Sequence, residues 1–276
     1  MPRGQGYWQE PEKGPGGFKT VMHLNIEGVQ IHVAEPQGRG TEKDPALLFV
    51  HGAGGDASIW DEQARYFEGR RLLFRLELPG HGQSGLSGEE HIINYTKWVR
   101  LAAGELFSSR PFVLVGHSMG GAIVLELATK PPVELKGIVL VGTGAKLGVT
   151  RAIFQMLTEN PEAFFQAIAE FAFSAHAPQE LRERFVQATR QCPPPVILKD
   201  FRACDRFDIR DRLGDIRLHT LIITGQDDQL APVRYAKYLH ENIVDSHLVL
   251  IPHAGHMVMA EQPALLNEAL ETFLDM

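Results

Sequence analysis

Short runs of hydrophobic residues recur along the chain, and most are followed by a longer segment with hydrophobic residues at helical spacing. Runs of about four to eight apolar or β-branched residues bounded by turn residues are typical of strands. We predict strands at 20–26, 30–34, 46–51, 71–77, 112–116, 135–141, 220–224 and 247–251, and helices at 59–67, 91–107, 119–129, 233–241 and 263–274. This alternation indicates an α/β fold with a largely parallel sheet.

The character of the individual runs adds detail to this picture. Glu27-Gly28 between the first two predicted strands is a hairpin signal, so the sheet is expected to begin antiparallel. Later strands, such as 47–50 and 138–141, are continuous apolar runs. Such runs are expected where helices cover both faces of a sheet.

Between 147 and 213 the strand pattern disappears and phenylalanines recur at helical spacing. We therefore predict an all-helical insertion at 147–213 within an α/β core formed by 19–146 and 214–276. The Gly- and Pro-rich residues 1–18 are expected to be a flexible tail. The phenylalanines of the insertion either form a small local core or in part line a binding cavity, with Phe154 and Phe165 as candidates.

Composition narrows the class of protein. The 276 residues are 44% hydrophobic and carry a net charge of −7, which argues against nucleic acid or an anionic membrane as a partner. No run reaches the roughly 18 uncharged apolar residues of a membrane span, and the N-terminal residues lack the apolar segment of a secretory signal. Two cysteines, Cys192 and Cys204, suggest reduced thiols and a cytoplasmic protein.

The sequence Gly116-His117-Ser118-Met119-Gly120 directly follows the predicted strand 112–116. A Gly-x-Ser-x-Gly turn between a strand and a helix lifts the serine hydroxyl clear of the backbone. Ser118 is therefore a candidate nucleophile. The alternative is that it only caps the following helix, since serine is a favoured N-cap residue.

A serine nucleophile needs an imidazole base and a carboxylate that orients it. Asp228 follows the predicted strand 220–224, and His256 follows the last predicted strand. Both lie where the C-terminal ends of parallel strands meet, which is where open α/β sheets bind ligands. Asp227 and His253 are the competing candidates. Asp228 is favoured by its place before a proline-started helix, and His256 by the flexible glycine before it.

Catalysis by serine also needs hydrogen-bond donors for a developing oxyanion. The glycine-rich segment 51–55 after the third predicted strand exposes backbone N–H groups, and Met119 begins a helix. We expect the N–H groups of Ala53 and Met119 to be these donors. No P-loop sequence is present, and the twelve histidines show no metal-ligand spacing, so neither a metal nor an organic cofactor is expected.

Taken together, His51-Gly52, the segment 78–84 (Leu-Pro-Gly-His-Gly-Gln-Ser), 116–121, Gly225-x-x-Asp228 and Gly255-His256 resemble the α/β-hydrolase family, in the branch with a helical cap. The resemblance implies a sheet of about eight strands, a cap at 147–213, and Ser118, Asp228 and His256 as the triad. Glu77 stands where members often carry aspartate. Segment 142–145, where some relatives place the acid, has no carboxylate, which favours Asp228.

The expected activity is hydrolysis of a small carboxylic ester, thioester or lactone. Expected substrate contacts are His51, Gly52, Trp60, His117, Phe154, Phe165 and Met257. One alternative is a carbon–carbon bond hydrolase for diketones, with an anionic substrate bound by arginines of the insertion (Arg151, Arg182, Arg184, Arg190, Arg202, Arg206 and Arg210). A cofactor-free perhydrolase or haloperoxidase and a non-catalytic binding protein are further alternatives.

Overall fold

The computed structural model describes residues 22–37 and 44–276, so the predicted tail 1–18 lies outside the described residues. The described strands are β1 (Met22–Ile26), β2 (Val29–Gln37), β3 (Ala46–Val50), β4 (Leu73–Leu76), β5 (Phe112–His117), β6 (Leu135–Val141), β7 (His219–Gly225) and β8 (Ser246–Ile251). The α-helices are α1 (Asp61–Phe67), α2 (Ile92–Leu106), α3 (Met119–Ala128), α4 (Arg151–Glu159), α5 (Pro161–Ala172), α6 (Gln179–Thr189), α7 (Pro194–Asp205), α8 (Val233–Asn242), α9 (Val258–Glu261) and α10 (Pro263–Leu274). Two 3₁₀ segments, η1 (Ala57–Trp60) and η2 (Arg210–Asp215), precede α1 and β7.

The described strands form one 8-stranded sheet in the order β1-β2-β4-β3-β5-β6-β7-β8. β1 pairs with β2 and β2 with β4 in antiparallel fashion, and every later pair is parallel. The predicted hairpin is confirmed: Glu27 and Gly28 adopt φ angles of 51° and 83° between β1 and β2. The predicted α/β fold with a mostly parallel sheet is confirmed as well.

The two faces of the sheet carry separate hydrophobic cores. Strand residues alternate between them: Leu48 and Val50 of β3 pack with α2, α3 and α8, whereas Leu47 and Phe49 pack with α1, α9 and α10. The continuous apolar runs in the sequence arise because side chains alternate along a strand and both faces are covered.

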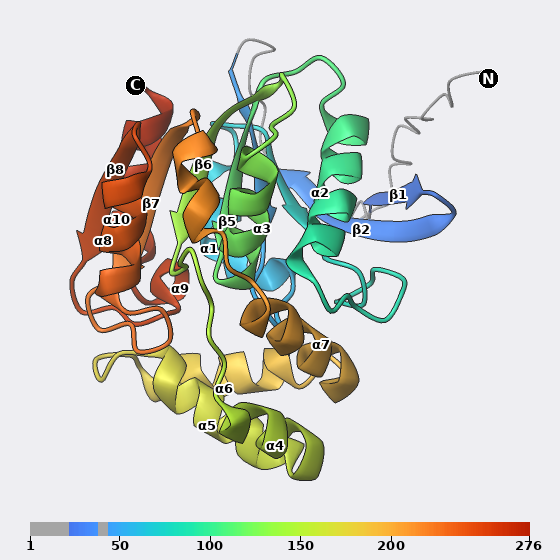
Figure 1. Ribbon diagram of the computed structural model, residues 1–276, viewed down its shortest axis with the longest axis vertical. Coiled ribbons are helices and arrows are strands. Elements are labelled where there is room, and N and C mark those ends of the chain that lie inside the picture. The colour runs from blue at the N-terminus through green and yellow to red at the C-terminus, as the bar shows by residue number, and fades with distance from the viewer. Residues whose placement is uncertain (1–21, 38–43) are drawn as a thin grey trace.

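Helices α4–α7 lie between β6 and β7 in the chain and gather on one side of the sheet, below it in Figure 1. They enclose a core of their own, formed by Leu157, Phe164, Phe165, Ile168, Ala169, Val186, Cys192, Val196 and Ile197. This part of the chain therefore buries side chains among its own helices in addition to those it packs against the sheet.

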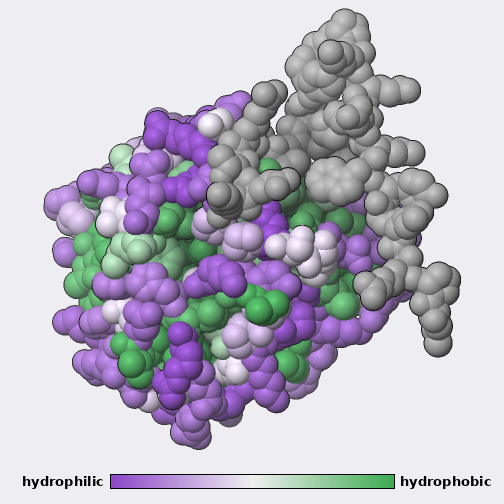
Figure 2. All heavy atoms as spheres, turned by 90° about the horizontal axis from the view of Figure 1, so that it is seen from above, coloured by the Kyte–Doolittle hydropathy of each residue, from purple (hydrophilic) through white to green (hydrophobic). Residues whose placement is uncertain are grey.

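The surface away from α4–α7 mixes hydrophilic and hydrophobic residues, as Figure 2 shows for the face seen from above. Within the ranges 22–37 and 44–276, no helix is long and apolar enough to cross a membrane. Both cysteines, Cys192 and Cys204, are buried and unbridged, as the sequence suggested.

Candidate active site

Ser118 occupies the sharp turn between β5 and α3. Its backbone has φ 54° and ψ −115°, a strained combination that costs a non-glycine residue on the order of 1–3 kcal/mol and clusters at functional sites. The Ser118 N–H donates to the Val141 carbonyl at 2.9 Å, and the Thr143 hydroxyl donates to the Ser118 carbonyl at 2.8 Å. The serine side chain makes no capping hydrogen bond to α3, so capping does not explain its presence.

Two glycines allow this turn to pack closely. A Cβ on Gly116 would collide with the Gly120 carbonyl oxygen, and a Cβ on Gly120 would collide with the carbonyl oxygen of Val50. α3 therefore begins too close to β5 and β3 for side chains at these positions. The close approach brings the N–H groups of the first turn of α3, including that of Met119, beside the end of β3.

Asp228 and His256 form a hydrogen-bonded pair in the loops that follow β7 and β8. Asp228 Oδ2 lies 2.9 Å from His256 Nδ1. Asp228 Oδ1 accepts the N–H groups of Leu230 and Ala231 at 2.9 and 2.8 Å. The Asp228 side chain is fully buried, whereas the His256 side chain keeps 8% of its surface exposed. These contacts fix the carboxylate, orient the imidazole and leave its Nε2 for another partner.

The competing residues lie away from this pair. Asp227 is exposed, and its N–H donates to the Ala254 carbonyl at 2.9 Å. His253 is also exposed, and its ring packs edge-on against His176 at a centroid distance of 4.7 Å. The structure therefore brings Asp228 and His256 together and leaves both alternatives at the surface.

The loop that carries His256 is bound to the end of α5. The N–H groups of His256 and Met257 both donate to the Ala172 carbonyl, at 2.8 and 3.1 Å. Glu261 in α9 accepts the N–H of Gly255 on one side and of Ser174 on the other, each at 2.8 Å. The position of His256 thus depends on the helical segment as well as on β8.

The loop after β3 runs beside the serine turn. A Cβ on Gly52 would lie 3.1 Å from the Ser118 Cβ, so the loop backbone is in contact with the turn. Ala53 lines the same cavity as Gly52 and Ser118. The next residue, Gly54, donates its N–H to Asp200 at 2.8 Å. Ala53 is therefore held between a close backbone contact and a hydrogen bond to α7.

Asp200 on α7 connects this loop to two other segments. Its Oδ2 lies 2.8 Å from His81 Nε2, and its Oδ1 accepts the Tyr95 hydroxyl at 2.5 Å. The side chains of Asp200 and His81 are both completely buried. Burial lowers the pKa of His81, but the charge of Asp200 and the hydrogen bond to it outweigh this and raise the pKa well above its ordinary value. The charged ring donates its second proton to the Pro79 carbonyl at 3.1 Å.

Two other buried histidines are held neutral. Burial, together with the nearby His81, lowers the pKa of His51 to about 4, and its Nε2 accepts the Leu78 N–H at 3.0 Å. Burial and the neighbouring His256 lower the pKa of His117 well below its ordinary value. His117 Nε2 lies 3.1 Å from the His256 carbonyl oxygen. The neutral ring of His117 therefore donates to the backbone of His256.

A cavity of about 380 Å³ opens between these loops and α4–α7, and both Ser118 and His256 line it. Much of its wall is apolar: Ile59, Leu147, Val149, Ile153, Ile168, Phe171, Phe185, Phe201, Leu230 and Met257. Among the described residues that line it, Arg234 alone is an arginine, lysine, aspartate or glutamate. An apolar wall with a few polar groups is typical of small-molecule sites.

Of the predicted pocket residues, Gly52, His117 and Met257 line this cavity. His51 and Trp60 do not, because both are completely buried behind the loops. Trp60 instead packs its ring against Phe49 at a centroid distance of 4.8 Å. Both side chains support the loops that face the cavity.

The two predicted phenylalanines also lie off the cavity wall. Phe165 belongs to the core of α4–α7, and Phe154 is partly exposed on α4. The wall is formed by other residues on the same helices, such as Ile153 and Phe171. Helical spacing shows that these positions are apolar, but it does not show which of them turn toward the cavity.

None of the arginines proposed for an anionic substrate lines the cavity. Arg202 and Arg206 pair with Glu90, Arg190 with Glu162, Arg210 with Asp208, and Arg182 donates to the Ser174 carbonyl. Arg151 and Arg184 are exposed. Neither Arg234 nor Asp200 is predicted from the sequence, because no local motif distinguishes either from a surface charge.

Comparison with known proteins finds a family model and several relatives that match this chain. A sequence model of the alpha/beta hydrolase family matches residues 47–269, a range that includes Ser118, Asp228 and His256. The chain is 29% identical over 252 residues to a putative carbamate hydrolase RutD of Azorhizobium caulinodans, covering 87% of this chain and 93% of that one. It is 26% identical over 243 residues to 3-oxoadipate enol-lactonase 2 of Acinetobacter baylyi, covering 85% and 90%.

Solved structures agree with these sequence relatives. The structure of a thermophilic esterase superposes with a TM-score of 0.80 at 32% identity, covering 93% of this chain and 97% of that one. The similarity therefore spans the sheet and α4–α7 alike.

Proposed function

Because this chain belongs to the alpha/beta hydrolase family and is a hydrolase, we propose that it is a serine hydrolase that cleaves a carboxylic ester, a thioester or a lactone. Ser118 is the nucleophile, His256 the general base and Asp228 the carboxylate that orients it. The observation that carries the proposal is the 2.9 Å contact between Asp228 and His256, with His256 and Ser118 lining one cavity.

The reaction proceeds through an acyl-enzyme. Ser118 Oγ attacks the substrate carbonyl carbon while His256 Nε2 takes the hydroxyl proton, and Asp228 stabilises the imidazolium. The N–H groups of Ala53 and Met119 donate to the oxyanion, each contributing on the order of 3 kcal/mol to transition-state stabilisation. His256 then gives its proton to the leaving alcohol or thiol. Water activated by the same imidazole releases the acid and regenerates Ser118.

The cavity and the relatives favour this class of substrate. An apolar wall with Arg234 as its one full charge among the described lining residues suits a substrate with an apolar acyl or alcohol group. The named relatives include a putative carbamate hydrolase, an enol-lactonase and an esterase. The carbon–carbon hydrolase alternative loses its main support because the arginines of the α4–α7 segment do not line the cavity. No specific observation favours a perhydrolase, a haloperoxidase or a non-catalytic protein.

Hydrolysis of p-nitrophenyl esters of increasing acyl length tests the proposal. We expect turnover with a burst of one p-nitrophenolate per active site, and a loss of turnover of about 10⁴-fold or more in Ser118→Ala. Ser108→Ala removes an exposed serine and should match wild type. Equal turnover in Ser118→Ala and wild type would reject Ser118 as nucleophile. Folded wild-type protein with neither turnover nor fluorophosphonate labelling would reject a serine hydrolase altogether.

A further inference from the structure

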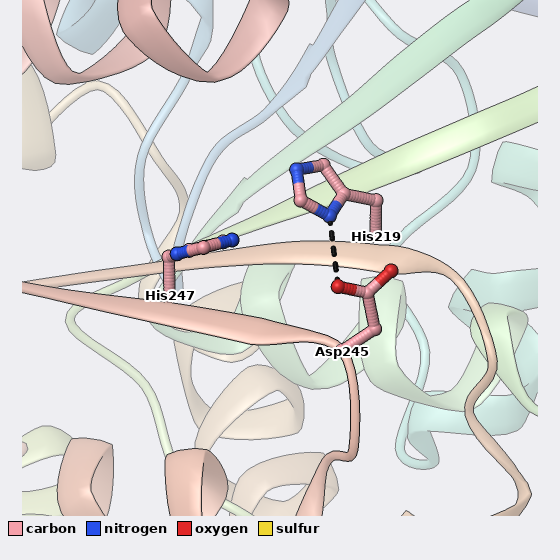
Figure 3. A group of neighbouring side chains, drawn as sticks. All are labelled: His219, Asp245 and His247. Carbon is pink, nitrogen blue, oxygen red and sulfur yellow. Dashed lines mark hydrogen bonds and ion pairs between the residues drawn. The ribbon is translucent and has the colours of Figure 1, made fainter. Parts of the chain in front are cut away.

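Three potential metal ligands meet at the N-terminal ends of β7 and β8, whereas the cavity lies at the C-terminal ends of the strands. His219 is the first residue of β7, Asp245 directly precedes β8, and His247 is the second residue of β8. β7 and β8 are parallel, with Leu221 paired to His247. Because side chains alternate along a strand, His219 lies on the face of Leu221, and Asp245 lies on the face of His247. Register therefore directs all three side chains to one face, as Figure 3 shows.

The separations of the ligand atoms suit a shared ion. His219 Nδ1 lies 3.1 Å from Asp245 Oδ1, and one ligand atom from each of the three residues lies within 4.8 Å of the others. Atoms bound to one zinc ion at about 2.1 Å lie roughly 3.0–3.5 Å apart. The His219–Asp245 distance already falls in this range. His247 is exposed, so rotation of its side chain brings a ring nitrogen closer.

Packing fixes the orientation of one of these ligands. The His219 ring stacks on Phe273 with a centroid distance of 4.6 Å and an angle of 6° between the planes. His219 Nε2 is buried with no hydrogen-bond partner among the described residues. Nδ1 is therefore the nitrogen that the packing directs toward Asp245 and the solvent side.

We propose that His219, Asp245 and His247 bind one divalent transition-metal ion of the zinc type. Two imidazoles and one carboxylate are donors that Zn²⁺ accepts, and the fourth position of a tetrahedral ion is then open to water. An ion pair between His219 and Asp245 would explain their contact. It would give no role to His247, whose ring centroid lies 5.2 Å from that of His219.

Such an ion would link the two strands that carry the catalytic acid and base. β7 and β8 end at the loops of Asp228 and His256. The first residues of both strands lie at the other end of the sheet, beside the proposed ion. At about 3.3 Å per residue, β7 separates the two ends by about 20 Å. Binding to the folded state alone raises the unfolding temperature in proportion to the logarithm of ion concentration above the dissociation constant. The catalytic groups stay out of contact with the ion.

Titration of metal-free protein with Zn²⁺ against a chromophoric chelator tests this site, with Co²⁺ absorption as a second readout of coordination. We expect one equivalent to bind to wild type, with affinity at least tenfold weaker in His247→Ala and in Asp245→Asn. His23→Ala is the matched control, since His23 is an exposed histidine on β1, and β1 and β8 lie at opposite ends of the strand order. This control should bind like wild type, and circular dichroism establishes that each variant is folded.

The same titration in His256→Ala separates this site from the catalytic pair. Retention of the ion in His256→Ala together with its loss in His247→Ala supports the proposal. Failure of wild type to bind at 1:1 stoichiometry overturns it. Unchanged affinity in His247→Ala, or loss in His256→Ala instead, overturns it as well. This test does not measure ester turnover. Its outcome for the metal site is therefore independent of whether the protein is a serine hydrolase.

Discussion

Two histidine–carboxylate pairs of almost equal length hold loops that line the cavity. Asp228 Oδ2 lies 2.9 Å from His256, and Asp200 Oδ2 lies 2.8 Å from His81. They differ in what surrounds the imidazole. His256 keeps 8% of its side chain exposed and lines the cavity. The side chains of His81 and Asp200 are completely buried.

The difference lies in the second ring nitrogen. His81 uses both nitrogens, one toward Asp200 and the other toward the Pro79 carbonyl. His256 has Nδ1 bound to Asp228, so Nε2 is left for chemistry at the cavity. A pair with both nitrogens occupied can only hold segments together, whereas a pair with one open nitrogen can transfer a proton. We therefore propose a structural role for the sealed pair, His81 and Asp200, and a catalytic role for the open pair, His256 and Asp228.

The largest expected effect is on turnover when the open pair is changed. Asp228→Asn should lower kcat for a p-nitrophenyl ester by about 10⁴-fold, because an amide does not hold the imidazole in the required tautomer or stabilise its charge. The free energy of unfolding should change far less, since the amide oxygen can still accept backbone N–H groups. Steady-state kinetics and urea unfolding measure both quantities. Asp227→Asn, at an exposed position next to it, should behave like wild type.

The sealed pair should respond in the opposite way. Asp200→Asn should lower the free energy of unfolding by about 3–5 kcal/mol, because it removes one partner of a buried charged pair. Turnover should fall only about tenfold, through loosening of the loop that Asp200 holds at Gly54. Urea unfolding measures the loss, with Asp211→Asn as an exposed control. A variant as stable as wild type would contradict the structural role of this pair.

The decrease in the free energy of unfolding caused by Asp200→Asn should also depend on pH. The folded-state pKa of His81 is raised above that of the unfolded chain. Its stabilisation is therefore present below about pH 6.5 and lost as pH rises through the folded value. The stability gap between wild type and Asp200→Asn should narrow in that alkaline direction. A gap that widens with rising pH would show that His81 is neutral in the folded protein.

The sequence and the structure agree best where the chemistry is local. Each residue of the open pair follows a predicted strand and sits in a turn with its own signal, such as the proline after Asp228 or the glycine before His256. The sealed pair joins positions 119 residues apart. In the sequence, Asp200 cannot be distinguished from the other polar residues of an amphipathic helix. Its burial follows only from how α7 packs on the loop of His81. No local pattern contains that information.

The cavity wall was less predictable for the same reason. Phe165 and Phe171 both fit the apolar period of α5, yet Phe165 is buried in the helical core and Phe171 is 49% exposed at the cavity. Their roles depend on the direction from which α6 and α7 approach. Likewise, α9 has only four residues (Val258–Glu261), too few to show a helical period.

After turnover in Asp228→Asn and stability in Asp200→Asn, the next largest effect is expected on stability in acid, through the neutral histidines buried behind the loops. The folded-state pKa of His51 is lowered to about 4. The stabilisation of the fold by neutral His51 is therefore complete above about pH 6.5 and is lost as pH falls toward 4. This should remove at most about 3 kcal/mol from the free energy of unfolding over that interval. Urea unfolding at several pH values measures the loss, which should be smaller in His51→Asn. An identical acid profile in that variant would contradict a buried neutral His51.

The smallest effect is expected at the cavity wall. Phe171→Ala should raise KM for long-chain p-nitrophenyl esters several-fold, because the substrate loses apolar contact, and should change stability by less than about 1 kcal/mol at this half-exposed position. A series of acyl lengths measures the change. Ile93→Ala truncates another exposed apolar residue, 57% exposed on α2, and should leave KM unchanged. An equal effect of both variants would remove Phe171 from the substrate site.

The most direct test of the catalytic role of the open pair is the mass of intact protein quenched in acid shortly after mixing with p-nitrophenyl acetate. We predict that wild type gains one acetyl group, that peptide mapping assigns it to Ser118, and that Ser118→Ala gains none. We further predict that Asp228→Asn gains it about 10⁴-fold more slowly than wild type, whereas Asp200→Asn gains it only about tenfold more slowly. Acetylation that persists in Ser118→Ala, or that slows equally in both aspartate variants, would contradict this account.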